Sequence, residues 1–547
     1  MAIDNQNPVL VVGAGPTGLT MACDLARHGV PVRIVDKRPQ IDPHCRATAI
    51  HSRTLEVLHD LGVVDEVVAA GRPYRAYNEY ANRRHVARHP TGHVDSPYPF
   101  TVQLEQCRTE EILEGLLSRL GGAVERGTEL LALKEHPDRV SATLRHQDGR
   151  EESIDTPWLV GCDGAHSTVR HLTHQTFPGQ EDPHQYVLTD VILEGDVAAD
   201  EGHGFLHDTG VLYLFPLPRG RTLVVASLTR LHDDTTEPPT VEMIRSLLAE
   251  RAPAGVRVSD PQWLSYFHIH YRLARHYRHG LRTFLAGDAA HVHSPVGGQG
   301  MNTGIQDAYN LGWKLGFVAR DLAPSTLLDS YEIERRAVAK DVLKTTRMMT
   351  ERSEAFGHLS AADRERLYVD VLVPETEARR IANHMEELDV DYRKSPICAE
   401  GGNGRRLAAG PHAGAEALDA GPLLRADQRL TLFELLRGPR HNLLLFPGVR
   451  SGNASWHRLA RLAAATQRDH TGLIDAHVVA RTGAAVPSDL PVATSVVVDA
   501  EGALHRRYGA QAECLYLIRP DGYVAYRSAP AAPSRLRDYL GRILSRS

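Results

Sequence analysis

Short apolar runs alternate with amphipathic segments along most of the chain, and residues 8–36 show this pattern first. The apolar run Val9–Val12 precedes an apolar stripe at helical spacing, which ends near Gly29 and leads into the run Val32–Val35. A short apolar run bounded by turn residues predicts a buried strand, and the stripe predicts a packed helix. Residues 8–36 therefore predict a strand–helix–strand unit.

The following part of the chain contains two helical patterns and one paired strand pattern. A helix is expected from near Arg53 to Gly62, because glycine tolerates the positive φ at which many helices end, and another over about residues 109–120. Alternating apolar and polar positions at 130–133 and 140–144 predict a β-ribbon inserted into the same domain.

From about residue 180 to 275 the pattern becomes strand-like, which predicts a second, mainly antiparallel sheet. The expected strands cover residues 186–188, 211–215, 222–228 and 263–271. The chain then returns to the first domain with a buried strand at 283–286. Helical patterns follow at 303–318 and 330–349.

A third region begins after the glycine-rich stretch 401–404 and alternates strand and helix patterns, which predicts an α/β layer. Its four candidate strands are residues 443–446, 476–479, 495–498 and 514–518. We expect this region to form a separate hydrophobic core. The predicted fold class is α/β, with a first domain at 1–180 and 276–400, a sheet domain at 181–275 and a third domain at 401–547.

Composition limits the classes of function. A net charge of −6 over 547 residues gives no reason to expect a nucleic-acid or membrane partner. The six cysteines are scattered without any Cys-x-x-Cys spacing, so we expect reduced thiols and no bound metal. The first apolar run is too short for a signal-peptide core, and no apolar stretch reaches the length of a membrane span. These features predict a soluble, cytoplasmic protein.

The turn after the first strand reads Gly13-Ala14-Gly15-Pro16-Thr17-Gly18. Glycines at these spacings allow a tight turn, close approach of the backbone to a pyrophosphate, and close packing of helix on strand. The N-terminus of the following helix supplies hydrogen-bond donors to the phosphates. Asp36, at the end of the second strand, is placed to accept hydrogen bonds from an adenosine ribose. This motif predicts a dinucleotide site without distinguishing FAD from NAD.

Two later segments combine an aspartate with glycines. The first runs from Cys162-Asp163-Gly164 to Arg170, and its local alternative is a turn in which Asp163 or Ser167 caps a helix. The second follows a predicted buried strand, and its small residues leave room for backbone to lie against a flat ligand. It reads Gly287-Asp288-Ala289-Ala290-His291 and continues through Pro295 into Gly297-Gly298-Gln299-Gly300-Met301-Asn302.

Joined in this order, the three motifs resemble the single-component, class A FAD-dependent aromatic hydroxylases, in the branch of phenol hydroxylases, aromatic polyketide hydroxylases and rifampicin monooxygenases. The resemblance covers roughly residues 8–345. It implies a Rossmann-like FAD-binding domain, an inserted antiparallel substrate domain and a C-terminal thioredoxin-like domain, which here lacks Cys-x-x-Cys and should have no thiol redox activity. The residues that it assigns to FAD are Gly13, Ala14, Gly15, Pro16, Thr17, Gly18, Asp36, Lys37, Arg38, Arg46, Ala47, Gln106, Cys162, Asp163, Gly164, Gly287, Asp288, Pro295, Gly298, Gly300, Met301 and Asn302.

The resemblance also implies roles for individual residues. Asp288 would accept hydrogen bonds from ribityl hydroxyls, and Gln106 would lie near the ribityl chain. Arg46 would contact the flavin, the alternative being a surface arginine in a loop. Pro295 and Gly297 would border the space where oxygen reacts, and the helix that begins there would stabilise anionic reduced flavin. No general base comparable to the tyrosines of the simplest members is evident.

The implied activity is monooxygenation. NAD(P)H docks transiently and reduces FAD, O2 then forms a flavin C4a-hydroperoxide, and its distal oxygen is transferred to an aromatic small molecule, such as a phenol, polyketide or antibiotic. Two alternatives stay open: Baeyer–Villiger-type oxygen insertion beside a polyketide ketone, and a flavoprotein that sequesters an aromatic drug. The protein would act as a monomer or a homodimer.

The second sheet is expected to cover the flavin and form the substrate pocket. Alternation places Tyr213 and Phe215 on one face and Leu214 on the other, without showing which face meets the substrate. The candidate substrate residues are therefore Tyr213, Leu214 and Phe215, with Pro295 and Val296 from the third motif. His268 and His270 share one face of a strand, but no third ligand is evident nearby, so we expect solvated histidines rather than a metal pair.

Overall fold

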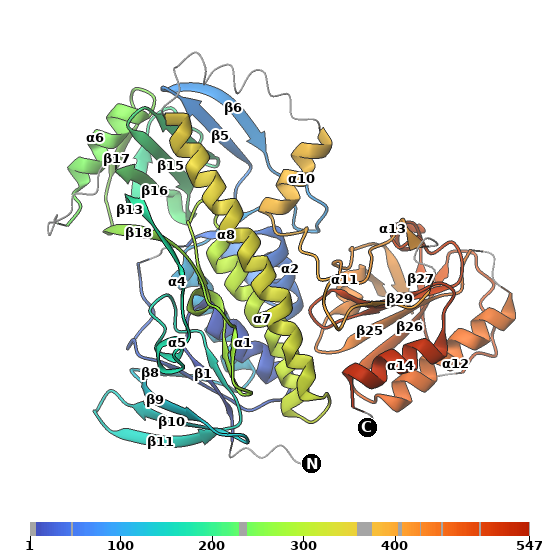
Figure 1. The fold of residues 1–547 in the computed structure, drawn as a ribbon. Coiled ribbons are helices and arrows are strands. Elements are labelled where there is room, and N and C mark those ends of the chain that lie inside the picture. Colours follow the sequence, from blue (N-terminus) through green and yellow to red (C-terminus); the bar gives the residue numbers. More distant parts are fainter. Residues whose placement is uncertain are drawn as a thin grey trace.

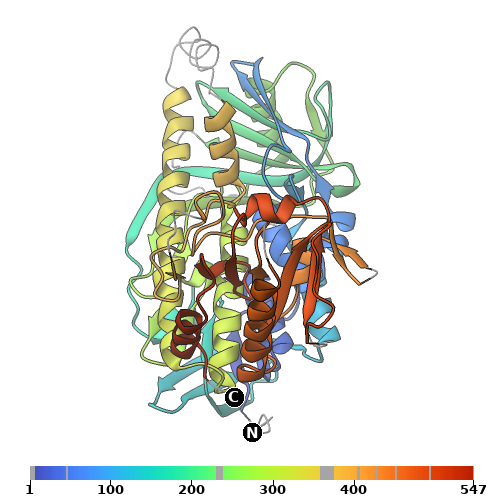
Figure 2. The same cartoon turned by 90° about the vertical axis from the view of Figure 1, so that its right-hand side faces the viewer.

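The computed structural model describes residues 7–44, 47–228, 238–357, 375–402, 407–426, 428–449, 452–491 and 494–545. The fold is α/β with mixed sheets, three of them large. In Figure 1, the C-terminal region in orange and red lies beside the long helices α7 (Gln299–Ala319) and α8 (Asp329–Gly357). The view in Figure 2 places this region in front of the same helices.

The first large sheet contains the predicted strand–helix–strand unit. Its order is β19-β20-β12-β1-β2-β8, and all pairs are parallel except β19–β20. Val11 pairs with both Ile34 and Val160, so the strand that enters the glycine turn lies in the middle of the sheet. The strands are β1 Val9–Val12, β2 Val32–Asp36, β8 Val124–Arg126, β12 Leu159–Gly161, β19 Arg278–His279 and β20 Thr283–Leu285.

Helices pack closely around this sheet. Helix α1 (Pro16–Arg27) contacts α7 and α4 (Gln106–Arg119), and α2 (Ser52–Leu61) ends at Gly62 with φ 82°, as predicted. The remaining elements of this half are α3 Val64–Ala70, α5 Thr168–Leu172, η2 Gly287–Ala289 and η3 Ser325–Leu328, with α10 Glu375–Met385 following α8. Two three-stranded antiparallel sheets complete it, one of them the predicted ribbon: β9 Glu129–Glu135, β10 Val140–Arg145 and β11 Glu151–Thr156; β3 Ala49–Ile50, β4 Arg72–Pro73 and β7 Val102–Gln103.

The second large sheet is mainly antiparallel, in agreement with the strand pattern after residue 180. All four predicted strands are present, but two more come from residues 76–90, where β5 pairs in parallel with β14. One face packs against α6 (Val241–Arg251). The strands are β5 Ala76–Ala81, β6 Arg84–Pro90, β13 Gly179–Glu194, β14 Gly202–His207, β15 Gly210–Pro216, β16 Arg221–Leu228, β17 Arg257–Ser259, β18 Leu264–Leu273 and β21 His291–Val292, with η1 Pro218–Gly220 between β15 and β16.

The C-terminal region forms an eight-stranded mixed sheet in the order β22-β29-β28-β25-β26-β27-β23-β24. The four predicted strands are all present and are neighbours near its middle. The strands are β22 Ala399–Glu400, β23 Leu423–Arg425, β24 Gln428–Leu430, β25 His441–Phe446, β26 Ile474–Arg481, β27 Ser495–Asp499, β28 Cys514–Ile518 and β29 Val524–Ser528; the helices are α11 Leu432–Leu436, α12 Asn453–Asp469, α13 Ala503–Arg507 and α14 Pro533–Ile543.

The hydrophobic core of the C-terminal region is separate on only one face of its sheet, which corrects the expectation of a wholly separate core. Leu444 and Phe446 belong to a core within this region, whereas Leu443 and Leu445 belong to a cluster continuous with the core of the first sheet. The Trp313 ring on α7 lies 5.3 Å from the His441 ring. The reason is that α7 carries large apolar side chains toward both the first sheet and the C-terminal sheet. The C-terminal sheet covers those that face it.

Candidate functional site

Two glycines of the first motif are required by the fold itself. Gly13 has φ 101°, and a Cβ there would lie 2.4 Å from the carbonyl oxygen of Cys162. A Cβ on Gly18 would lie 1.9 Å from the carbonyl oxygen of Gly13. Both distances are far below any real contact, so these positions allow β1, α1 and the segment after β12 to pack together.

At three other glycines of the motifs, a Cβ would meet no close neighbour. A Cβ on Gly15 or Gly300 would have no heavy atom nearer than 3.9 Å, and one on Gly164 would have none within 4 Å. The packing of the protein therefore does not explain why Gly15 and Gly300 lack a side chain. A dinucleotide that lies against the backbone would explain both glycines, and this contact stays a prediction.

Asp36 lies at the end of β2 beside this cradle. Its carboxylate accepts hydrogen bonds of 2.8 Å from the backbone amides of Ala14 and Arg38, and the Arg38 side chain adds a contact at 3.2 Å. Burial alone would raise the pKa of Asp36, but the hydrogen bonds from Arg38 and Ala14 outweigh it and hold the pKa below its usual value. The Asp36 carboxylate is therefore negatively charged and accepts hydrogen bonds, one of which holds the glycine turn in place. Lys37, by contrast, is exposed.

Glu110 is a site candidate that the sequence did not predict. Gln106, assigned to the ribityl region, donates a 2.8 Å hydrogen bond to Glu110 Oε1 one helical turn away. That oxygen lies 3.9 Å from the position of a Gly15 Cβ, while Oε2 is buried without a hydrogen-bond partner among the described residues. Burial raises the pKa of Glu110, partly offset by Gln106. The i, i+4 spacing from Gln106 was the available signal.

The second motif makes the local contacts of its alternative interpretation. The Ser167 hydroxyl caps α5 by accepting from the Arg170 amide at 3.0 Å, and it donates to Asp163 at 2.5 Å. The Val169 amide also donates to Asp163, at 3.1 Å. Asp163 therefore fixes the start of α5 beside the glycine cradle. A contact of Asp163 or Cys162 with FAD stays a prediction.

The third motif is anchored to α1 through its glycines. Gly287 has φ 61°, and a Cβ on Gly287 or Gly304 would lie 2.6 or 2.5 Å from the Thr17 hydroxyl. The buried carboxylate here is Asp307, which accepts from the Gly287 amide at 3.1 Å, from His291 at 2.7 Å and from Arg335 at 2.6 Å. Asp288 is exposed, and its contact with the ribityl chain stays a prediction.

The N-terminus of α7 is formed by Gly297 and Gly298, with φ of 85° and 68°. Gly298 is the N-cap and has no side chain to accept from the first-turn amides, which leaves them for another acceptor. Asn302 is buried and donates to the carbonyl oxygens of Ala49 at 2.9 Å and Gly298 at 2.7 Å. His293 Nε2 lies 4.0 Å from the position of a Gly300 Cβ and is buried without a hydrogen-bond partner among the described residues. Burial lowers the pKa of His293 to about 4, so it is neutral at pH 7.

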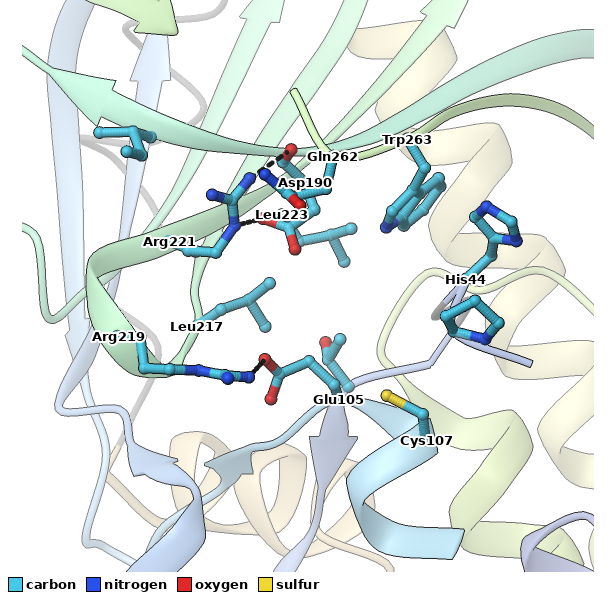
Figure 3. A pocket seen from close by; sticks show the side chains of 13 residues that line it. His44, Glu105, Cys107, Asp190, Leu217, Arg219, Arg221, Leu223, Gln262 and Trp263 are labelled. Atoms are coloured by element: carbon cyan, nitrogen blue, oxygen red, sulfur yellow. Dashed lines mark hydrogen bonds and ion pairs between the residues drawn. The ribbon is translucent and has the colours of Figure 1, made fainter. Parts of the chain in front are cut away.

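A pocket of about 530 Å³ opens between the first domain and the second sheet (Figure 3). Figure 3 shows the Trp263 and His44 rings at one side and the ion pairs Arg219–Glu105 and Arg221–Asp190 at the other. The pocket adjoins the segments that carry Ala47 and Gln106. It is lined by Pro43, His44, Thr48, Glu105, Cys107, Asp190, Ile192, Leu217, Arg219, Arg221, Leu223, Gln262 and Trp263.

The two faces of the second sheet can now be distinguished. Leu214 packs with Ile244 of α6 in the core on one face. Phe215 packs on the other face with Leu217 and Leu223, both of which line the pocket. Tyr213 alternates with Leu214 and stacks with Phe215 at 6.3 Å between ring centroids. Of the three predicted substrate residues on β15, Tyr213 and Phe215 therefore share the pocket's face, and Leu214 points away from it.

The described contacts do not bring all of the predicted site residues into the site. Arg46 lies outside the described residues, so its role stays a prediction. Pro295 is exposed beside the start of α7, and Val296 is half-buried there; neither lines the pocket of Figure 3. His268 and His270 lie within 4.0 Å of Glu181, and no group of three or more potential metal ligands is found in the described part of the chain. No helix in that part is both long and apolar enough to span a membrane.

Several known proteins are similar to this chain in sequence and fold. The FAD binding domain family matches residues 6–346. The chain is 36% identical to 6-methylpretetramide 4-monooxygenase of Streptomyces rimosus, over 96% of this chain and 92% of that protein. It is 32% identical to pentachlorophenol 4-monooxygenase of Sphingobium chlorophenolicum, over 95% and 93% of the two chains. The crystal structure of aklavinone-11 hydroxylase with FAD and aklavinone has a TM-score of 0.74 at 27% identity, over 98% and 99%.

The matches to the two monooxygenases extend over nearly the whole length of both chains. With the family match they define an FAD-dependent monooxygenase, the class that the three motifs predicted. The chain belongs to the FAD binding domain family, among its class A flavin monooxygenases. It therefore uses FAD, with a reduced nicotinamide as reductant and O2 as co-substrate.

Proposed function

We propose that this monooxygenase hydroxylates an aromatic ring of a phenolic, multi-ring small molecule of the polyketide type. The observation that carries the proposal is the match at 36% identity, over almost the full chain, to a protein named 6-methylpretetramide 4-monooxygenase. The fold shared with aklavinone-11 hydroxylase supports it. A pocket of about 530 Å³ lies within the size range of small-molecule sites, and its lining combines Trp263 and aliphatic side chains with two arginine–carboxylate pairs.

We assign the cofactor site to the glycine cradle and the residues around it. Gly15 and Gly300 would let backbone lie against FAD, Asp36 would accept from the adenosine ribose, and Asp288 would accept from the ribityl chain. The first-turn amides of α7 would bind the pyrimidine edge, where the helix dipole favours negative charge. When bound, FAD supplies the redox and oxygen-transfer chemistry, and the protein supplies orientation and exclusion of water.

We assign the aromatic substrate to the face of the second sheet that carries Phe215 and to the adjoining pocket. Trp263 offers a ring for stacking, and Leu217 and Leu223 offer apolar surface. Both arginines of the pocket are already paired with carboxylates, so the pocket has little net charge to attract an ionic substrate. An uncharged or phenolic ring system fits this lining best.

We further propose the domain assignment of the sequence: FAD binding at 1–180 and 276–400, substrate binding at 181–275 extended by β5 and β6, and a thioredoxin-like domain at 401–547. The two halves of the first domain supply β1, β2 and β12 on one side and β20 and α7 on the other. In this arrangement the third domain makes no direct contact with FAD. The active unit is a monomer or a homodimer.

The test is a product analysis with a panel of phenolic tetracyclic and anthraquinone compounds. Hydroxylation adds one oxygen and replaces an aromatic C–H by C–OH, which NMR detects as a lost ring proton. Insertion beside a ketone also adds one oxygen but leaves every ring proton in place. Oxidation of NAD(P)H that no panel compound stimulates, with tight ligand binding, would instead indicate a sequestering flavoprotein.

A further inference from the structure

A buried histidine and carboxylate meet at the N-terminus of α7. The His51 side chain is 6% exposed and that of Glu386 is 13% exposed. His51 Nε2 lies 2.8 Å from the Gly297 carbonyl oxygen, and Nδ1 lies 3.3 Å from the Thr101 hydroxyl and 3.6 Å from Glu386 Oε2. Residues separated by more than 240 positions in the sequence therefore form one cluster where the third motif begins its helix.

The hydrogen bonds determine which nitrogens of His51 carry protons. A carbonyl oxygen can only accept, so Nε2 donates to Gly297. The single proton of the Thr101 hydroxyl is donated to Glu386 Oε1 at 2.6 Å, so this hydroxyl can only accept from Nδ1. Both ring nitrogens face acceptors, and the doubly protonated imidazolium is the form that satisfies all of them.

Glu386 is held as the matching anion. Its Oε2 accepts from the Ser52 amide at 2.7 Å, at the N-terminus of α2. The Ser52 hydroxyl lies 3.0 Å from the same oxygen but has a closer acceptor, the Tyr98 carbonyl oxygen at 2.7 Å. Burial alone would raise the pKa of Glu386, but the hydrogen bond and charge of His51, with Thr101 and Ser52, lower it to about 2. A carboxylate at a helix N-terminus is further favoured by the helix dipole.

A second carboxylate, Glu387, also lies near His51, and burial raises its own pKa. Burial would lower the pKa of His51, but the contacts with Glu386 and the charge of Glu387 raise it above its ordinary value. Glu387 accepts from Thr303 at 3.0 Å on the facing helix α7. Arg53, the next cation along α2, is already paired with Glu56 and Glu416. The positive charge of His51 is therefore lost only as pH rises through its raised pKa.

We propose that Glu386 holds His51 as a cation at the start of α7, so that its charge favours the reduced, anionic form of FAD over the oxidised form. His51 acts through the peptide of Gly297, which it holds by a hydrogen bond, and through its charge beside the helix N-terminus. Glu386 is a positioning residue that acts through His51. This inference rests on the proposed function in one respect, the assignment of residues 297–302 to FAD.

The measurement is the midpoint potential of bound FAD as a function of pH, together with the dissociation constants of oxidised and reduced FAD. His51→Gln keeps a donor to the Gly297 carbonyl oxygen and removes the charge. It should weaken the binding of reduced FAD about tenfold more than the binding of oxidised FAD. For a two-electron couple this lowers the midpoint potential by about 30 mV. The difference from wild type should vanish above the pKa of His51. In Glu386→Gln, His51 loses its anionic partner and its pKa should fall. The change in midpoint potential that accompanies loss of the His51 charge should therefore occur at lower pH.

The matched control is His505→Gln, which removes another buried imidazole paired with a carboxylate, Asp499 at 2.8 Å, in the C-terminal region. It should leave the midpoint potential unchanged. Equal weakening of oxidised and reduced FAD in His51→Gln, or an unchanged potential at every pH, would show that the cluster is only a structural clip and overturn the proposal. If His51→Gln does not fold, the pH step in wild type and Glu386→Gln decides in the same way. Normal FAD affinity in Gly300→Val would instead show that the cofactor lies elsewhere.

Discussion

At the scale of single residues, the glycines of the motifs divide into two physical kinds. Gly13, Gly18, Gly287 and Gly304 are required because a Cβ would collide with neighbouring atoms, whereas a Cβ on Gly15 or Gly300 would meet no heavy atom nearer than 3.9 Å. The second kind is where we expect FAD to lie against the backbone, since the surrounding packing would accept a Cβ there. A motif match does not distinguish the two kinds, but the packing around each Cα does.

Gly300→Val and Gly304→Val test this division as a matched pair on one helix. Gly300→Val should lower the free energy of unfolding less than Gly304→Val does, because its Cβ would meet no heavy atom nearer than 3.9 Å, and it should weaken FAD binding at least tenfold. Gly304→Val should lower the free energy of unfolding by about 1–3 kcal/mol, because its Cβ would lie 2.5 Å from Thr17. Chemical denaturation and FAD titration of the apoprotein measure the two effects. Equal loss of stability in both variants would contradict the assignment.

Asp288→Ala tests the ribityl contact. The change leaves ligand hydroxyls without their acceptor, a loss of about 1–3 kcal/mol, so FAD affinity should fall by roughly one to two decades. Because Asp288 is exposed in the ligand-free protein, the free energy of unfolding without FAD should hardly change. A titration that returns wild-type affinity would remove Asp288 from the site.

At the scale of elements, local patterns predicted most of the strands and helices, while the contacts between distant segments were beyond them. All four predicted strands of the C-terminal sheet and all four of the second sheet are present. Alternation on β15 could not choose between the faces of Tyr213 and Leu214, because that choice depends on where α6 packs. The pairing of β5 with β14 and the contact of Glu386 with His51 join segments far apart in sequence, and no periodicity signals them.

The lowered pKa of Glu386 also predicts how the stability of the protein changes on acidification. Its pKa falls from 4.5 to about 2, so its contribution to stability is present above pH 4.5 and is lost as pH falls toward 2. The shift corresponds to roughly 3 kcal/mol. Glu386→Gln should therefore be less stable than wild type at pH 7 and should lose less stability on acidification. Denaturant midpoints measured between pH 7 and pH 3 show the difference, and parallel curves for the two proteins would contradict it.

Helix α8 carries a buried charge cluster against α7 and the C-terminal sheet. Glu334 accepts from Lys314 at 2.7 Å and from Arg519 at 2.7 and 2.9 Å, and all three side chains are at most 1% exposed. Glu334→Gln leaves the buried Lys314 without its ion-pair partner and Arg519 with Asp521 alone, so it should cost about 3–5 kcal/mol. The exposed pair Arg347–Glu351 on the same helix is the control, and Glu351→Gln should cost less than about 1 kcal/mol. Equal effects would contradict the role of burial.

At the scale of the whole molecule, the C-terminal region is a docked part of the structure rather than a loosely tethered one. Its Arg519 reaches Glu334, its Glu416 pairs with Arg53, and its His441 packs on Trp313. Truncation near Gly402 would expose Trp313 and leave Glu334 with one partner fewer. The truncated protein should therefore be less soluble, and any soluble fraction should still bind FAD. Sedimentation and flavin absorbance measure both outcomes.

Cys514→Ser tests whether that region contributes chemistry. Burial raises the pKa of the Cys514 thiol to about 12, so it is protonated and inert at neutral pH. NAD(P)H oxidation and product formation should equal those of wild type. A variant that binds FAD normally but no longer forms product would contradict a structural role.

The account rests centrally on a bound flavin that transfers one atom of O2 to an aromatic substrate. Incubation of the purified yellow holoenzyme with NAD(P)H, a phenolic polyketide and 18O2 tests this in one mass spectrum. The predicted product gains one 18O atom and loses one ring proton, and each turnover consumes one NAD(P)H and yields one water with the other oxygen. A colourless protein that gains no flavin on reconstitution, or a product whose added oxygen comes from water, would contradict the account.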